Sequence, residues 1–327
     1  MRSGFQTALF AGVGAGLIAV GAIALHAHAA AGSLAEAHAA LQSGEADKAL
    51  ILLNSLPASA EAHNLRCRVQ LILDHLDAAT SECQQAVSMD GESSGYHLWL
   101  GRVLGERASR ASFMSAFGLA KQVRAELESS VRLDPRNADA LADLGEFYKS
   151  APGVLGGGED KAEGVAAELD KVDQARAHQL RGWIAEGHKD YGTAERELKA
   201  AIGVDPHPAF SWMSLASFYR RRERWTDLDA ALESGMKSAQ HDRKAGVALY
   251  NGAMVLTKAN RTLPLAAKML RDYLSRDSKT EEAPAFVAHV RLARVLAQLG
   301  DKAGADEQRA AALALAHDYK PALELKF

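Results

Sequence analysis

The chain has 327 residues, of which 48% are hydrophobic and only 6% are aromatic. Its formal net charge is −3 and its pI is near 6.5, so it has no broad positive field and we expect no nucleic-acid partner. The composition is rich in alanine and poor in aromatic residues, which favours many thin helix contacts over one large core.

Residues 1–30 have the features of an export signal or a membrane anchor. Arg2 is followed by an almost uncharged apolar stretch from Ala8 to Leu25, and the small residues Ala27 and Ala29 then suit a signal peptidase. The apolar stretch, as a helix, is about 27 Å long, which is marginally enough to span hydrocarbon. A cleaved signal and an uncleaved inner-membrane anchor therefore both stay open. Either one predicts an exported protein, periplasmic, secreted or anchored, that contacts membrane only through this segment.

Two short helical hairpins are expected next, from Ser33 to Leu56 and from Ala60 to Gly91. Cys67 and Cys83 fall in the first and second helices of the latter hairpin, at positions that should face each other. In an oxidising compartment they could form a disulfide. The alternative is a pair of buried thiols that act as small hydrophobic side chains.

The following two hairpins each contain an insertion. Asp90 precedes Asp134 by one 34-residue period plus ten residues, and Phe113 and Phe117 lie at helical spacing inside the excess. We therefore expect lengthened helices near residues 105–122. Residues 151–158 contain a proline and clustered glycines, which predict an enlarged turn between two helices.

From Arg176 to Gln240 the chain repeats itself at an offset of 34 residues. Tyr191 recurs as Trp225, and Leu198 recurs as Leu232, so size and polarity are kept while identity drifts. Such a period is typical of helical hairpins that bury their apolar faces by stacking on their neighbours. Two further hairpins are expected from Lys244 to Asp277 and from Phe286 to His317.

This pattern resembles tetratricopeptide (TPR) repeats. The unit from Ala209 to Arg222 is closest, because it carries the residues that the family places in its first helix, which are Trp212, Leu215, Ala216 and Tyr219. The run from His97 to Pro135 is also similar to a bacterial exported, envelope-type subgroup. The resemblance implies an all-α, right-handed α-solenoid of about eight TPR-like hairpins over residues 31–310, with residues 311–327 as a C-terminal capping helix or tail.

In this family the first helix of each hairpin lines a concave groove, where a protein or peptide partner binds. The candidate groove residues, spaced for one helical face, are Trp99, Arg102, Glu146, Lys149, Arg176, Gln179, Trp183, Glu186, Phe210, Met213 and Arg220. A large aromatic side chain such as Trp183 suits anchoring of an extended peptide. The alternative role for Trp183 is packing between adjacent helices.

No constellation of base, nucleophile and oxyanion donor is present at supporting spacings, and the twelve histidines include no helical metalloprotease pair. We therefore expect no catalytic residue, cofactor or metal site. The leading hypothesis is an exported, non-enzymatic scaffold that binds a peptide or partner protein of the cell envelope in the groove. The alternatives are an enzyme or enzyme subunit with a small-molecule site at the two insertions, and a membrane-tethered structural spacer.

Overall fold

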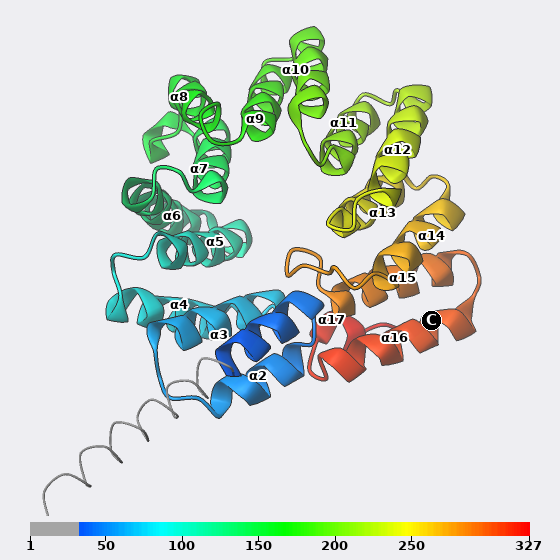
Figure 1. The fold of residues 1–327 in the computed structure, drawn as a ribbon, viewed down its shortest axis with the longest axis horizontal. Helices are drawn as coiled ribbons and strands as arrows, with labels where there is room; N and C mark the ends of the chain where they lie inside the picture. Colours follow the sequence, from blue (N-terminus) through cyan, green and yellow to red (C-terminus); the bar gives the residue numbers. More distant parts are fainter. Residues whose placement is uncertain (1–32) are drawn as a thin grey trace, which may run out of the picture.

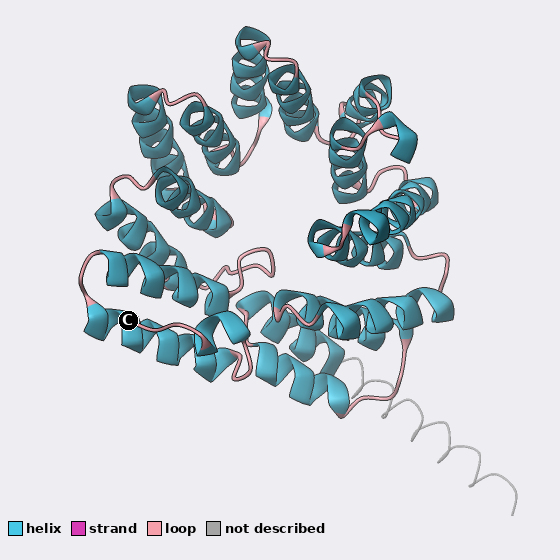
Figure 2. Cartoon of the chain, turned by 180° about the vertical axis from the view of Figure 1, so that it is seen from behind, coloured by secondary structure: helices cyan, strands magenta, loops and turns pink. Residues whose placement is uncertain are grey.

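The computed structural model describes residues 33–327, and all regular secondary structure in this range is helical (Figure 2). The predicted all-α solenoid of about eight hairpins is confirmed. In the described range, no helix combines the length and apolarity needed to cross a bilayer. The predicted signal or anchor from Ala8 to Leu25 lies outside the described residues.

The helices follow one another in pairs, with residues 33–43 forming the first helix of the first pair. The elements are α2 (Ala46–Asn54), α3 (Ala60–Ile72), α4 (Leu76–Met89), α5 (Ser94–Arg110), α6 (Phe113–Leu133), α7 (Ala138–Ser150), η1 (Gly153–Leu155), α8 (Glu159–Leu169), α9 (Gln174–Gly187), α10 (Tyr191–Val204), α11 (Ala209–Arg221), α12 (Trp225–Gln240), α13 (Gly246–Ala259), α14 (Leu263–Leu274), α15 (Ala285–Gln298), α16 (Lys302–Leu315) and α17 (Lys320–Leu323).

The hairpins are arranged around a ring (Figure 1). The first helices α5, α7, α9, α11 and α13 lie on the inside of this ring, and their partners α6, α8, α10, α12 and α14 lie outside. Consecutive first helices contact one another; for example, α7 contacts α9, and α11 contacts α13. The inner wall of the ring is therefore made of first helices.

The six hairpins without an insertion turn in the same way. Each has a residue with positive φ directly after its first helix or one residue later; these residues are Gly44, Asp74, Lys189, Glu223, Asn260 and Gly300, and the turn between α13 and α14 has a second one, Thr262. In the first of these turns the N–H of Glu45 donates to the carbonyl of Ala40, as in a Schellman motif. This left-handed residue ends the first helix and lets the chain reverse within a few residues.

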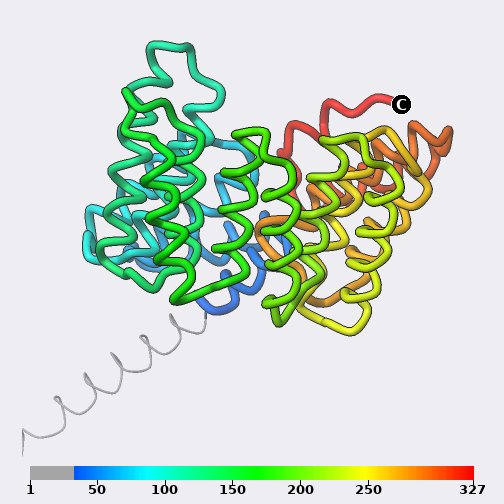
Figure 3. Tube along the Cα trace, turned by 90° about the horizontal axis from the view of Figure 1, so that it is seen from above, coloured from blue at the N-terminus to red at the C-terminus, as the bar shows by residue number. Residues whose placement is uncertain are grey.

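The two hairpins with insertions differ from this pattern. The helices α5 and α6 have 17 and 21 residues, whereas α9 and α10 have 14 each. The inserted residues lengthen both helices, and the chain turns between them at Ala111 and Ser112. In the next hairpin η1 and the glycines that follow it form a wide turn. The chain between α5 and α8 rises above its neighbours on one side of the ring (Figure 3).

The ring is closed by a hydrophobic core that both ends of the described chain share. Leu41 and Leu53 of the first hairpin are buried in one cluster with Phe286 and Val290 of α15 and with Tyr319 near the C-terminus. Figure 1 shows α2 and α3 beside α15 to α17. The two open flanks that an ordinary solenoid must cap therefore cover each other.

The last repeat ends with α16, which includes the expected boundary at residue 311 and continues to Leu315. The remaining tail contains only the short helix α17, and its Tyr319 and Ala322 pack against the N-terminal hairpin. In the structure the N-terminal hairpin covers the last repeat together with this tail.

Candidate functional site

Two adjoining cavities hollow the inner wall of the ring. The larger, here called the lumenal cavity, has a volume of about 480 Å³ and is lined by α5, α7, α9, α11, α13 and the loop before α15. The smaller, here called the side cavity, has a volume of about 260 Å³ and lies between α9, α11 and α13. Trp183 and Phe210 line both cavities. These two aromatic residues therefore mark the point where the cavities meet.

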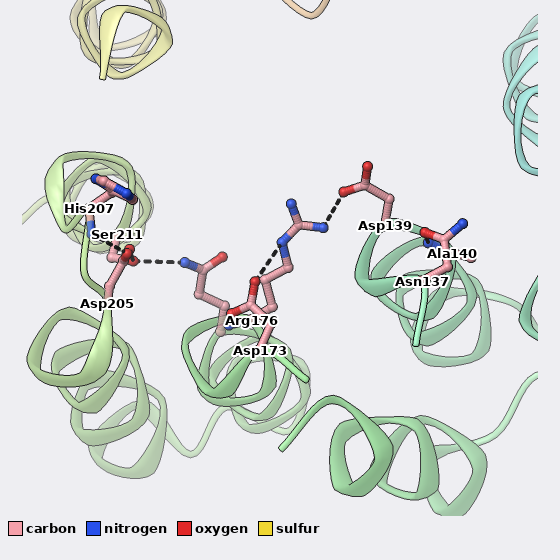
Figure 4. Close-up of polar contacts among 9 residues, drawn as sticks. Asn137, Asp139, Ala140, Asp173, Arg176, Asp205, His207 and Ser211 are labelled. Carbon is pink, nitrogen blue, oxygen red and sulfur yellow. Dashed lines mark hydrogen bonds and ion pairs between the residues drawn. The ribbon is translucent and has the colours of Figure 1, made fainter. Parts of the chain in front are cut away.

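Polar side chains link each first helix to the next along this wall (Figure 4). Arg176 of α9 donates to Asp139 of α7, and Asp173 caps α9 by accepting from the backbone N–H of Arg176 at 3.0 Å. The buried Gln179 donates to Ser211 of α11 at 3.0 Å, and Ser211 donates to Asp205 at 2.6 Å. Buried polar groups of this kind must be paired to be tolerated.

Similar polar contacts link the first helices before and after these, along the same wall. Arg102 of α5 donates to Asp143 of α7 at 2.6 Å. Arg221 of α11 donates two hydrogen bonds of 2.7 Å to the carboxylate of Glu186 on α9. Such bidentate pairs fix geometry as well as adding stability. Several of the predicted groove residues therefore hold neighbouring repeats together.

The structure separates the eleven predicted groove residues into groups. Seven line the two cavities, and these are Arg102, Glu146, Arg176, Gln179, Trp183, Phe210 and Met213. Of these, Gln179 and Met213 are buried. Trp183 is partly buried against the core, and Phe210 is 41% exposed. Glu146 is exposed, and among the described residues its carboxylate has no hydrogen bond or ion pair.

The other four predicted residues do not line these cavities. Trp99 is stacked by the guanidinium groups of Arg68 and Arg102, at 4.9 and 4.7 Å from its ring centroid. Glu186 forms an ion pair with Arg221. Lys149 is exposed near the end of α7, and Arg220 is half-buried near the end of α11.

The lumenal cavity is acidic. Its lining holds seven carboxylates, from Asp139, Asp143, Glu146, Asp173, Asp205, Asp242 and Glu282, against three cations, from Arg102, Arg176 and Lys244. Burial raises the pKa of Glu282, as do the nearby carboxylates of Asp139 and Glu281, while Arg102 and Arg176 oppose this rise. The cavity therefore favours a cationic group over an anionic one.

Glu281 and Glu282 belong to a loop that the sequence analysis did not assign to the site. The loop, residues 275–284, has ten residues, whereas the linkers before α5, α7, α9 and α11 have four each. It points into the ring from α15 (Figure 1), and Glu281 is bonded by Arg68 of α3. The unusual length of this loop was the feature of the sequence that could have indicated its place in the site. The side-cavity residues Asn251, Met254 and Lys258 of α13 were missed as well, since that hairpin matches the repeat pattern weakly.

The structure joins Cys67 of α3 to Cys83 of α4 by a disulfide. Both cysteines are fully buried within one hairpin, on the wall between the N-terminal repeats. The bond lies away from the two cavities, so its role is to hold the hairpin rather than to line the candidate site.

Comparison with known proteins gives distant similarities. No protein-family model matches the chain. Mouse Superkiller complex protein 3 is 25% identical over 283 residues, which cover 72% of this chain and 17% of that protein. The chain thus spans only about a sixth of the length of this curated relative.

Two solved structures are similar in part. The thermophilic TPR protein TTC0263 of Thermus thermophilus has a TM-score of 0.46 and 20% identity, over 53% of this chain and 90% of that one. The type IV pilus biogenesis factor PilW has a TM-score of 0.40 and 18% identity, over 68% and 98%. The consecutive helical hairpins of this chain are the arrangement that the resemblance to TPR repeats implies.

Proposed function

We propose that the chain is an exported interaction scaffold that holds an extended segment of a partner protein against the inner wall of the ring. The observation that carries the proposal is the meeting of two cavities at Trp183 and Phe210. A TPR-like solenoid supplies a protein-interaction surface of this kind. The proposal includes that the partner is a protein and that the chain has no catalytic activity of its own.

The two aromatic residues are suited to anchor a partner. They lie on neighbouring first helices, and Phe210 keeps 41% of its surface exposed although it is a large apolar side chain. Binding energy at interfaces is concentrated in a few buried aromatic and arginine contacts that exclude water. A partner side chain that enters the cavities would desolvate both rings and add such a contact.

Export is proposed from the N-terminal sequence, and the partner is placed in the cell envelope for the same reason. Fractionation of cells that express the full chain tests this part. We expect the protein outside the cytoplasm, and the mass of its N-terminal peptide distinguishes a signal cleaved near Ala29 from a retained anchor. Recovery in the cytoplasm with an intact N-terminus would contradict it.

Capture of envelope proteins by the purified chain tests the binding surface. Trp183→Ala and Phe210→Ala should each lose the partner by tenfold or more, because each removes an anchor of about 2 kcal/mol. Phe113→Ala is the matched control, since Phe113 is 85% exposed and lies outside both cavities. Equal capture by all three variants would exclude the inner wall as the site.

A further inference from the structure

Three side chains that could hold a metal ion, Asp47, His317 and Asp318, lie together where the two ends of the ring join, and His75 lies beside Asp318. Asp47 lies in α2, His75 lies in the turn between α3 and α4, and His317 and Asp318 lie between α16 and α17. We call them the seam cluster. The Nδ1 atom of His317 is 2.9 Å from Oδ1 of Asp47, and the Nε2 atom of His75 is 3.7 Å from Oδ2 of Asp318. One ligand atom each from Asp47, His317 and Asp318 lies within 4.8 Å of the other two.

The donor set is that of a transition metal. Zinc in proteins is held by imidazole nitrogen and carboxylate oxygen at bonds of about 2.0–2.2 Å, so a tetrahedral ion separates its ligand atoms by roughly 3.3–3.5 Å. The distances of 2.9 and 3.7 Å in the seam cluster lie on either side of this value. Calcium and magnesium prefer oxygen ligands throughout, and the two imidazoles argue against them.

Neighbouring groups orient the cluster. The Nδ1 atom of His75 is 2.9 Å from Oε1 of Gln70, so a proton on Nδ1 is donated to Gln70 and the Nε2 lone pair faces Asp318. Ligating histidines are held in this way by their second nitrogen. The backbone N–H of His317 donates to Oδ2 of Asp47 at 2.9 Å. In the described part of the chain, Oδ1 of Asp318 is buried and has no hydrogen-bond partner.

We propose that a zinc ion binds at the seam cluster, held by Asp47, His75, His317 and Asp318, and fastens the ring. The first two ligands come from the N-terminal hairpins and the last two from the C-terminal tail. A metal that binds only when these segments are together stabilises the closed form by its binding free energy. This inference is independent of the groove proposed above.

Zinc titration of the purified, tag-free full chain by calorimetry tests the site. We expect one zinc per chain, and the cobalt(II)-loaded protein should show the visible bands of a tetrahedral ion. His317→Ala and Asp318→Asn should each weaken zinc binding at least tenfold. The matched control is His207→Ala, because His207 is an exposed histidine paired with Asp242 at 2.7 Å that belongs to no cluster of three possible ligands in the described chain. This variant should bind zinc as the wild type does.

Thermal unfolding with and without zinc tests the effect on closure. Zinc should raise the midpoint of the wild type and of His207→Ala, but not that of Asp318→Asn. The Asp318→Asn change keeps the side-chain shape, so its metal-free midpoint shows whether the fold survives. Absence of stoichiometric binding by the wild type, or an equal loss in His207→Ala and His317→Ala, would overturn the proposal.

Discussion

Trp183 and Phe210 differ from the polar residues of the inner wall in what they contact. Arg176 and Glu186 are bonded to the neighbouring first helices, so their substitution changes the stability of the stack as well as its surface. Phe210 is 41% exposed where the two cavities meet, and Trp183 lines the same cavities and is partly buried. At the scale of single residues, Phe210 is therefore the clearer candidate for a role in binding alone, whereas Trp183 also packs against the core.

Sequence spacing selected eleven residues, of which seven line the two cavities, but it did not show which polar residues are already paired. The pairs Arg176 with Asp139 and Arg221 with Glu186 join residues 37 and 35 positions apart. These separations are close to one repeat, so residues one period apart were the candidates for contact. Whether two such side chains form an ion pair depends on their rotamers, and these are set by the packing around them, which a single sequence does not show.

Glu195 provides a residue-scale prediction about pH. Burial raises its pKa, but hydrogen bonds from Arg224, Lys199 and Tyr219 outweigh this and lower the pKa to about 2. A lowered folded-state pKa gives stability that is present above the unfolded value of about 4.3 and is lost as the pH falls towards 2. We expect Glu195→Gln to cost about 1–2 kcal/mol at pH 7, after allowance for solvent screening, and almost nothing at pH 2.

Urea unfolding at pH 7, 4.5, 3 and 2 measures this effect. Glu233→Gln is the control, because Glu233 is exposed on α12 and has no ion pair among the described residues. Its effect should be small at every pH. If Glu195→Gln shifts stability equally at pH 7 and pH 2, the carboxylate does not stabilise the contact between α10 and α11.

At the scale of elements, the turns decide how closely each hairpin can pack. Asn260 and Gly300 are residue types that favour positive φ, whereas Lys189 and Glu223 adopt it without that preference. The sequence predicted the helix pairs because their apolar period is strong. It predicted the turns less well, because the left-handed residue is imposed by the packing of the two helices on either side.

The disulfide between α3 and α4 gives an element-scale prediction. Cys67 and Cys83 are 16 residues apart, and a disulfide that closes a loop of that size stabilises the folded state by about 3 kcal/mol. The double variant Cys67→Ala/Cys83→Ala should therefore unfold at lower urea concentration, by about 2–3 kcal/mol. Thiol titration of the denatured, unreduced protein comes first, since two free thiols would show that the bond does not form.

The control for this prediction is the reductant. Reduced wild type and the double variant should have similar stabilities, because both lack the constraint on the unfolded chain. If the reductant leaves the wild-type unfolding curve unchanged although the bond is present, the disulfide does not stabilise this hairpin.

At the scale of the whole molecule, the ring is closed by contacts between residues more than 200 positions apart. Gln42 donates to Glu281, and Arg68 bonds the same carboxylate. The sequence pattern predicted a stack of hairpins with two exposed flanks and a capping tail. It could not predict that the flanks meet, because that depends on the small rotation between successive repeats, summed around the stack.

Gly44 tests the fit of this seam. It has a φ of +74°, and an added Cβ would lie 2.3 Å from the backbone nitrogen of Ala285. Gly300 also has a positive φ, of +85°, but an added Cβ there would meet no atom within 4 Å. We expect Gly300→Ala to cost about 1 kcal/mol from backbone strain alone, and Gly44→Ala to cost about 1–3 kcal/mol more.

Urea unfolding of the two variants measures the difference, which isolates the clash from the strain. Gly44→Ala should also expose the tryptic site at Lys48 of α2 faster than Gly300→Ala does, since the first hairpin would lose its contact with α15. Equal costs for the two substitutions would mean that the first hairpin does not press against α15.

The most direct test of ring closure is a double-mutant cycle on Arg68 and Glu281. These residues lie 213 positions apart, and their side chains are only 12% and 11% exposed. The free energies of unfolding of the wild type, Arg68→Ala, Glu281→Ala and the double variant give their coupling energy. A closed ring predicts a favourable coupling of about 1–3 kcal/mol. A coupling of zero within error would show that the two ends do not meet, and would contradict the account.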